Sequence, residues 1–274
     1  MKHIPLIRAN ILNGFIAYLE EIAAPTQQLL TQAKLPASAL HDPESLLPLK
    51  QVFEFYERSA RSTGCEHFGL MVGQRIQLPD LGAFGRLIYQ SFTLHEAIHT
   101  GIYMLATYNS GERIWLLEQN DQSDQVWLGR NVIDNIRIGR QQAEHCALMI
   151  MLNVIQLAAN SEWRPAEIHL ETGQTKELHK IEVLSDTKIL FNQKATAIVF
   201  PRSFLSLPLR HTDNPQPEQR CKDYEILYTS APATSFAGSV RQIATALLKD
   251  GYPDIRVIAD MVGMSVRTFQ RQLS

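Results

Sequence analysis

Apolar residues recur at helical spacing through much of the first third of the chain. The segments "GFIAYLEEI" and "PLKQVFEFYERSARSTG" place them three and four apart, which predicts amphipathic helices. Pro48 precedes the second pattern and Gly64 ends it, as expected for the start and stop of a helix. The run 147–159, "ALMIMLNVIQLAA", is apolar on nearly every side and too short to cross a bilayer. We expect it to be a helix buried in the core or, alternatively, in a subunit interface.

Shorter stretches alternate between apolar and polar residues and predict strands. "RIWLLEQNDQSDQVWLGR" indicates two strands around a polar turn, "AEIHLET" another strand, and "KILFNQKATAIVFP" a further strand pair. "KELHKI" indicates a short polar helix between them. Helices and strands alternate without an internal repeat. The predicted fold class is therefore α+β: a mixed α and β N-terminal domain followed by an all-α terminal segment.

The periodicity fades at "LPLRHTDNPQPEQR" (207–220), where Pro208, Pro215 and Pro217 cluster. Prolines and polar residues at this density predict a domain boundary. We divide the chain into a first domain, 1–209, a linker, 210–235, with room for a connecting helix around "EQRCKDYEILY", and a terminal segment, 236–274.

Composition is ordinary for a globular protein of 274 residues, with 45% hydrophobic and 20% charged residues and a net charge of −2. The charge is uneven, because the terminal segment is +2 and the remainder −4. Cys65, Cys146 and Cys221 lie far apart, so reduced thiols in a cytoplasmic protein are expected rather than a metal site. The N-terminus lacks the pattern of a secretion signal.

The terminal segment predicts two short helices joined by a tight turn. Asp254 is suited to cap the first helix, Gly263 to form the turn and Ser265 to cap the second. The residues expected to face inward are Val240, Ile243, Ala244, Leu247 and Leu248 from the helix before this pair, Ile255, Ile258, Ala259 and Val262 from the first helix, and Val266, Phe269 and Leu273 from the second.

The opposite face of the last helix carries planar hydrogen-bonding side chains. Its members are Arg267, Gln270 and Arg271, with Ser274 at the end. From a helix in the major groove, arginine can bond guanine and glutamine can bond adenine, each through two hydrogen bonds. Ser265 and Thr268 suit phosphate contacts. Turn and face together favour DNA binding over the alternative, a merely solvated helix face.

The segment "IRVIADMVGMSVRTFQRQLS" resembles the first helix–turn–helix of the AraC/XylS-type (arabinose-operon) regulators. The matching positions are Ala259, Gly263, Ser265, Phe269, Gln270 and Arg271. "HFGLMVGQ", "LGAFGRLIYQSFTLHEAIHTGIYMLATY", "EWRPAEIHLE" and "ILFNQKATAIVFPRSFLSLPL" resemble the effector-binding and dimerisation domain of one branch of that family.

This resemblance implies a homodimeric transcription regulator without a cofactor, whose partners are double-stranded DNA, a small-molecule effector of unknown identity and, as one option, RNA polymerase. Bases would be read by Arg267, Gln270 and Arg271. Family members carry two helix–turn–helix units, whereas this sequence ends with the first recognition helix. We therefore expect this length of chain to bind DNA weakly and to fray at its C-terminal end.

A rival interpretation comes from "HEAIH", which matches the zinc-hydrolase pattern His-Glu-x-x-His through His95, Glu96 and His99. The competing explanation is local, because Thr93 and Glu96 form a capping box, and Phe92 and Ala97 are placed to form a hydrophobic staple. Glu96 would then bond the Thr93 backbone instead of activating water, and this explanation is favoured. No catalytic or metal-binding residue is therefore assigned.

Residues of the effector site remain unassigned by the sequence. Trp115, Trp127, Tyr89 and Tyr103 are candidates to line a cavity, although such aromatic residues more often belong to the core. A third interpretation of the whole chain is a sensor protein whose terminal helices bind another protein.

Overall fold

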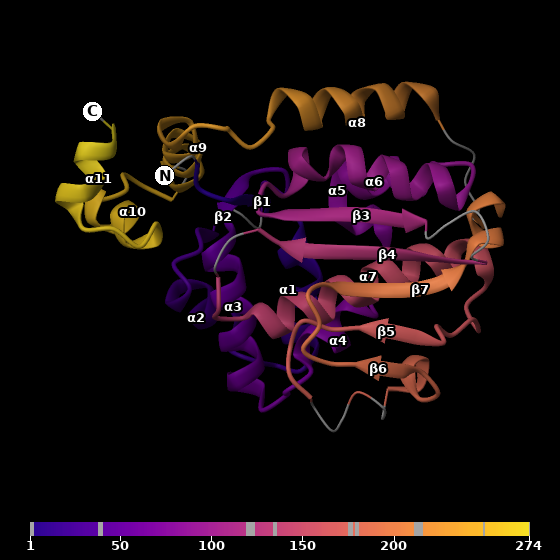
Figure 1. The fold of residues 1–274 in the computed structure, drawn as a ribbon. Coiled ribbons are helices and arrows are strands. Elements are labelled where there is room, and N and C mark those ends of the chain that lie inside the picture. Colours follow the sequence, from indigo (N-terminus) through magenta and orange to yellow (C-terminus); the bar gives the residue numbers. More distant parts are fainter. Residues whose placement is uncertain are drawn as a thin grey trace.

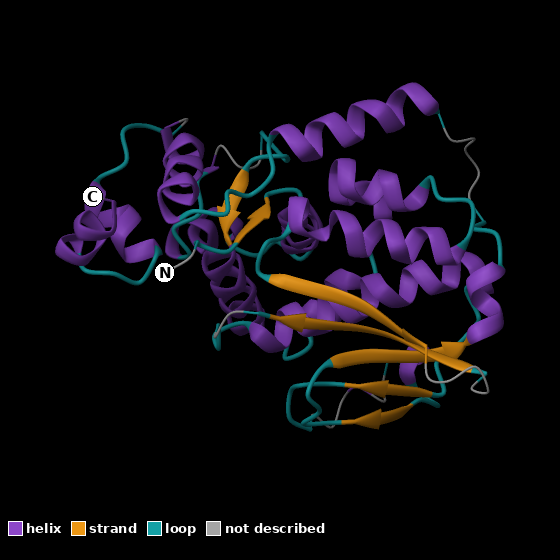
Figure 2. Cartoon of the chain, turned by 45° about the horizontal axis from the view of Figure 1, so that its top comes forward, coloured by secondary structure: helices purple, strands orange, loops and turns teal. Residues whose placement is uncertain are grey.

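The computed structural model describes residues 3–37, 41–118, 124–133, 136–174, 178, 181–210, 216–248 and 250–273. A five-stranded sheet in the order β3-β4-β7-β5-β6 carries helices on one face (Figure 1, Figure 2). The strands are β3 (Glu112–Glu118), β4 (Gln125–Val132), β5 (Glu167–His169), β6 (Lys188–Leu190) and β7 (Thr196–Pro201). With helices and a mostly antiparallel sheet, the predicted α+β class is confirmed.

Seven α-helices precede residue 160 in the described chain. They are α1 (Ile11–Glu21), α2 (Thr26–Gln32), α3 (Leu49–Thr63), α4 (Phe68–Gly73), α5 (Gly82–Tyr89), α6 (Leu94–Tyr108) and α7 (Arg140–Ala159). Pro48 occupies the N-cap of α3, and Gly64 ends it with a φ of 65°, as predicted. The apolar run at 147–159 lies in α7, and most of this helix is buried in the core.

Among the described residues, the short 3₁₀ turns of this part are η2 (Leu78–Leu81), η4 (Glu182–Leu184) and η5 (Arg202–Ser206). α6 and α7 pack against the sheet, through β3 and β7 respectively, and give the core its second layer. Among the described residues, no helix is long and apolar enough to cross a membrane.

One strand prediction is wrong in its pairing. β6 and β7 both form within "KILFNQKATAIVFP", but they are not neighbours, because β5 lies between them. The central residue of β5, Ile168, is fully buried and lies opposite Ile198 of β7 and Ile189 of β6. β5 therefore pairs with both β6 and β7, in place of the direct pairing of β6 with β7 that their proximity in sequence predicts. Most of "KELHKI" lies outside the described residues.

The chain ends in four helices: α8 (Pro217–Thr229), α9 (Phe236–Leu248), α10 (Ile255–Met261) and α11 (Val266–Leu273). The connecting helix expected near "EQRCKDYEILY" is α8, which runs along α5 and α6 (Figure 1). The last three helices, here called the terminal unit, lie at one end of the molecule beside the N-terminus (Figure 1). There they meet a small antiparallel sheet of β1 (Leu6–Arg8) and β2 (Leu46–Pro48).

Candidate functional site

The turn between α10 and α11 has the predicted geometry. Asp254 caps α10, because its Oδ1 accepts a hydrogen bond from the Arg256 N–H at 2.8 Å. Gly263 adopts a φ of 69°, a left-handed conformation that glycine reaches without strain. Ser265 Oγ then accepts a hydrogen bond from the Thr268 N–H at 3.2 Å and caps α11.

The three side chains predicted to read bases share one exposed face of α11. Arg267, Gln270 and Arg271 are exposed, as is Ser265, while Thr268 is half-buried. The Ser265 hydroxyl also donates a hydrogen bond to the Thr268 hydroxyl at 3.0 Å, so these two groups engage each other. Ser274 lies outside the described residues. The expectation that the planar groups of α11 face solvent is therefore met.

The inner side of α11 is held mainly by Phe269, which is 2% exposed. Its ring packs edge-on against Phe236 of α9, with 5.8 Å between ring centroids. Three residues expected to face inward are instead exposed: Leu248, Ile255 and Leu273. They lie at the ends of short helices, where no described segment covers them, and Met261, which was not predicted, is buried instead.

Residues of β1, of β2 and of the segment before β1 complete the core of the terminal unit. Ile4, Leu6 and Leu46 belong to the same buried cluster as Phe236 and Phe269. The Ile4 N–H also donates a hydrogen bond to Ser239 Oγ of α9 at 3.2 Å. The terminal unit is therefore packed onto the first domain by segments more than 180 residues away in sequence.

Two polar contacts reinforce this packing. The buried Gln51 side chain on α3 donates a hydrogen bond to the Met261 carbonyl at 2.9 Å. Lys34 forms an ion pair with Asp260 on α10, and both side chains are substantially exposed. An exposed pair of this kind contributes about 1 kcal/mol or less. Apolar burial and the Gln51 bond thus dominate the attachment.

Arg8 joins β1 to the end of α8. Its guanidinium is fully buried and donates hydrogen bonds to the carbonyls of Leu227 and Thr107, at 3.2 and 3.0 Å. An ion pair with Glu44 at 3.0 Å compensates its charge. Burial lowers the pKa of Arg8 below its ordinary value, with Glu44 opposing that shift. One side chain thereby connects α8, the C-terminal end of α6 and the loop before β2.

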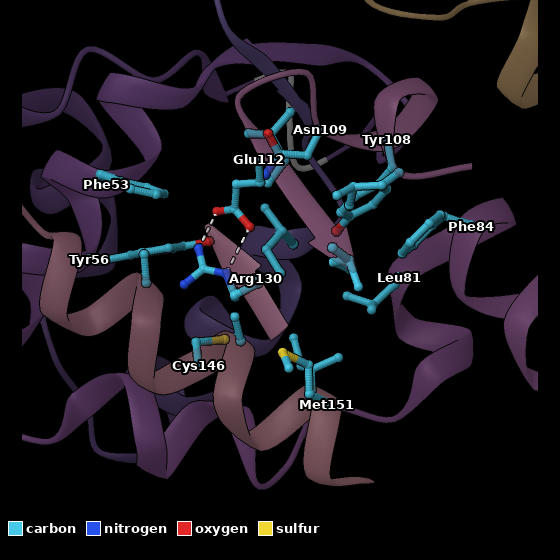
Figure 3. Close-up of a pocket in the computed structure, with 17 residues that line it drawn as sticks. Phe53, Tyr56, Leu81, Phe84, Tyr108, Asn109, Glu112, Arg130, Cys146 and Met151 are labelled. Atoms are coloured by element: carbon cyan, nitrogen blue, oxygen red, sulfur yellow. Dashed lines mark hydrogen bonds and ion pairs between the residues drawn. The ribbon is translucent and has the colours of Figure 1, made fainter. Parts of the chain in front are cut away.

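Inside the first domain, a cavity of about 90 Å³ lies between the sheet and the helices (Figure 3). Its lining comes from β1, α1, α3, η2, α5, α6, β3, β4 and α7 and is largely aliphatic and aromatic. The polar members are Tyr56, Tyr108, Asn109, Glu112 and Arg130, together with the Cys146 thiol. A concave, largely apolar lining with a few polar groups has the chemistry of small-molecule sites, although this cavity is smaller than most of them.

A buried ion pair forms the polar side of the cavity. Arg130 Nη2 lies 2.6 Å from Glu112 Oε1, and Arg130 Nε donates to Glu112 Oε2 at 3.1 Å. The two side chains project from neighbouring strands onto the helix-covered face of the sheet (Figure 3). Burial opposes the charge of Arg130, but the carboxylates of Glu112, Glu144 and Glu171 outweigh it and raise the pKa of Arg130.

The remaining ionisable groups of the cavity are neutral at pH 7. Burial, helped by the proximity of Cys146, raises the pKa of Tyr56 and of Tyr108 well above the ordinary tyrosine value. Burial also raises the pKa of the Cys146 thiol to about 12. The Tyr108 hydroxyl is buried and makes no hydrogen bond to any described residue. Its ring stacks on Phe84, with 4.5 Å between ring centroids.

Sequence reasoning missed this cavity. Trp115, Trp127, Tyr89 and Tyr103, the aromatic residues considered for it, do not line it. Strand alternation carried a signal that was not used. In β4, the buried Arg130 follows Val126 and Leu128 at every second position. A charged residue at an inward position predicts either a buried partner or a functional site.

The His-Glu-x-x-His stretch lies on the first turns of α6, with 4.2 Å between the ring centroids of His95 and His99. Glu96 is committed elsewhere: Oε1 accepts a hydrogen bond from Arg220 of α8 at 3.0 Å, and Oε2 accepts one from the Phe92 N–H at 2.9 Å. The capping interaction is present, because Thr93 Oγ1 accepts from the Glu96 N–H. The second hydrogen bond of the capping box differs from the expected one, because the Glu96 side chain accepts from the Phe92 N–H and not from the Thr93 N–H.

The staple expected of Phe92 does not form, since its side chain is 64% exposed. Within the described chain, no third histidine, cysteine, aspartate or glutamate joins His95 and His99 in a group able to hold a metal. The stretch is used as a helix start that is tied to α8 by Glu96.

Comparison with known proteins agrees with this architecture. Residues 24–209 match the family model described as the arabinose-binding domain of AraC transcription regulator, N-terminal. No curated protein matches the chain. The structure of transcriptional regulator CdpR from Pseudomonas aeruginosa has a similar fold, with a TM-score of 0.50 at 17% identity. That match covers 91% of this chain and 77% of the CdpR chain. Since the family model spans more than half of the chain, the protein belongs to the AraC-type transcription regulators and is not an enzyme.

Proposed function

We propose that the protein is a sequence-specific DNA-binding regulator that responds to a small molecule and acts as a homodimer. The terminal unit would read DNA, and the first domain would bind the effector and dimerise. The proposed division follows the boundaries expected from the sequence: 1–209 for the first domain, 210–235 for the linker and 236–274 for the DNA-binding segment.

The observation that carries DNA binding is the exposed face of α11. A helix that presents Arg267, Gln270 and Arg271 to solvent has the hydrogen-bonding groups that read base edges in a major groove. Phe269 anchors the other side, so the face is presented by a supported helix. The Thr268 and Ser265 hydroxyls, at the N-terminal end of α11, are proposed to contact phosphate.

Strand β1 supports the proposed response to an effector. Its side chains alternate, as in any strand, so that Ile7 lines the cavity while Leu6 and Arg8 face the other way. Leu6 packs in the core of the terminal unit, and Arg8 bonds the end of α8. A ligand that displaced Ile7 would therefore move the strand that holds the terminal unit.

Dimerisation and contact with RNA polymerase are proposed from the family alone. In a dimer, two copies of α11 would contact two half-sites, whose spacing reports the symmetry of the assembly. Light scattering of the purified protein, alone and with DNA, measures whether the protein is a dimer.

The experiment for the proposed function is selection of bound sequences from a random DNA pool by the full-length protein. A sequence motif shared by the selected DNA molecules supports the proposed function. The affinity of the protein for this motif should also fall steeply as the salt concentration rises, because the release of counterions drives DNA binding. Recovery of no common motif would overturn the proposed function. Salt-insensitive capture of a protein by the terminal unit would instead favour a protein-binding role.

A further inference from the structure

We propose that the cavity of the first domain binds a small neutral molecule with an apolar or aromatic body and a single hydrogen-bonding group. The inference rests on the proposed function, since it gives the chemical class of the effector for such a regulator.

Two adjoining cavities define the size and apolar character of the ligand. Beside the 90 Å³ cavity lies a second one of about 60 Å³, whose lining consists only of aliphatic and aromatic residues and Gly101. The two share the lining residues Leu81, Phe84, Ile114, Ile150 and Met151. An apolar cavity of roughly 150 Å³ accommodates a benzene-sized molecule. A single ring or a short branched chain that occupied both cavities would match their combined volume.

Tyr108 provides the hydrogen-bonding position, because the other buried lining atom that makes no hydrogen bond to a described residue, Arg130 Nη2, is held in its ion pair with Glu112 Oε1 at 2.6 Å. Its side chain points into the group of lining residues beside Phe84, and its hydroxyl has no partner among the described residues (Figure 3). A buried hydroxyl without a hydrogen bond is unfavourable, because it has lost its bonds to water without replacement. A ligand group that bonds this hydroxyl recovers that cost, which a purely apolar ligand cannot do.

Charge and hydrogen-bonding capacity exclude two other ligand classes. The charge of Arg130 is already compensated by Glu112 within the cavity, so a ligand carboxylate would add an uncompensated buried charge. A sugar carries a hydroxyl on nearly every carbon. Arg130 and Glu112 already bond each other, and Asn109 Oδ1 accepts from the Gly111 N–H, so the lining leaves too few polar groups to bond most of those hydroxyls.

The test uses four probes on the full-length protein: 4-fluorophenol, fluorobenzene and 4-fluorobenzoate, followed by ¹⁹F NMR, and L-arabinose, followed by calorimetry. At pH 7 we expect 4-fluorophenol to bind best and fluorobenzene about tenfold more weakly, because it lacks the hydroxyl. We expect no binding of 4-fluorobenzoate or L-arabinose at millimolar concentrations.

Three variants locate the site. Tyr108→Phe is expected to weaken 4-fluorophenol about tenfold and to leave fluorobenzene unchanged. Tyr103→Phe, on the exposed side of the same helix, is the matched control and is expected to change neither. Ala147→Leu, which adds bulk to a lining position on α7, is expected to abolish both. Thermal melting verifies that each variant is folded.

Several results would overturn the inference. They are the absence of binding by every probe, binding of L-arabinose or 4-fluorobenzoate that Ala147→Leu removes, or an affinity for 4-fluorophenol that Tyr108→Phe does not change. DNA binding is measured separately on the same preparations. If DNA binds and no probe does, only the ligand class is wrong. If 4-fluorophenol binds as expected but DNA does not, the regulator function is wrong and the ligand site remains.

Discussion

Arginine serves opposite purposes in the cavity and on α11. Arg130 is 2% exposed and already paired with Glu112, so its charge is compensated before any ligand arrives. Arg267 and Arg271 lie on an exposed helix face, where their charge is available to an outside partner. The cavity is therefore suited to neutral molecules. The exposed face of α11 is suited to a polyanion such as DNA, whose base edges carry hydrogen-bonding groups.

The two regions also differ in how they are held together. The cavity lies within a core that extends over the whole first domain. The terminal unit has a much smaller cluster, to which Ile4, Leu6 and Leu46 of the first domain contribute. Changes near the cavity should therefore affect the whole fold, whereas changes in the small cluster should affect the attachment of α9–α11.

The largest effect is expected when the cavity arginine loses its partner. Glu112→Ala leaves Arg130 buried without a carboxylate, which should lower the free energy of unfolding by about 3–5 kcal/mol. Urea denaturation measures this change. The control is Glu118→Ala on the same strand, where the ion pair with Arg202 is partly exposed and contributes about 1 kcal/mol or less. Equal losses in the two variants would contradict the special role of the buried pair.

A smaller, local effect is expected from the strand that joins the regions. Leu6→Ala empties a fully buried position in the cluster of the terminal unit, at a cost of about 3 kcal/mol. Hydrogen exchange should become faster in α9, α10 and α11 and stay slow in α7. Leu117→Ala, at an exposed position on β3, is the control. Faster exchange spread evenly over the chain would show that the terminal unit is not a separate cluster.

Acid should weaken the first domain through His145. This residue of α7 is fully buried, and burial, with a contribution from His67, lowers its pKa to about 3. In the unfolded chain the pKa is about 6.5. Between these values the unfolded state binds the proton and the folded state does not, so stability falls as pH falls below 6.5.

From pH 7 to pH 5 this group alone should remove roughly 2 kcal/mol of stability. His145→Gln, which does not titrate, should lose that much less than the wild type over the same range. Denaturation curves at the two pH values measure the difference. Parallel pH dependence in both proteins would show that His145 titrates normally in the fold.

Local signals were enough to predict the terminal helices but not the cavity. The caps at Asp254 and Ser265 and the turn at Gly263 depend on residues within a few positions of one another, and all three are present in the structure. The cavity combines side chains from nine segments, so its existence depends on long-range packing.

The errors have related causes. The order of β5, β6 and β7 depends on which strand is buried in the middle, which sequence proximity does not reveal. Leu248, Ile255 and Leu273 follow the helical period correctly, yet short helices leave their ends uncovered. Arg130, at an inward position of an alternating strand, carried a signal of the site that sequence reasoning did not use.

The most direct test of α11 as the DNA-reading element compares Arg267→Ala with Arg113→Ala, an exposed arginine on β3. Fluorescence anisotropy measures the affinity of each full-length variant for the selected sequence and for its single-base variants. Arg267→Ala should cost about 1–3 kcal/mol on the selected sequence and remove discrimination at one base, while Arg113→Ala leaves both unchanged. If Arg267→Ala still discriminates between the single-base variants as the wild type does, base reading by this helix is contradicted. This holds whether the variant loses affinity equally on all sequences or loses none.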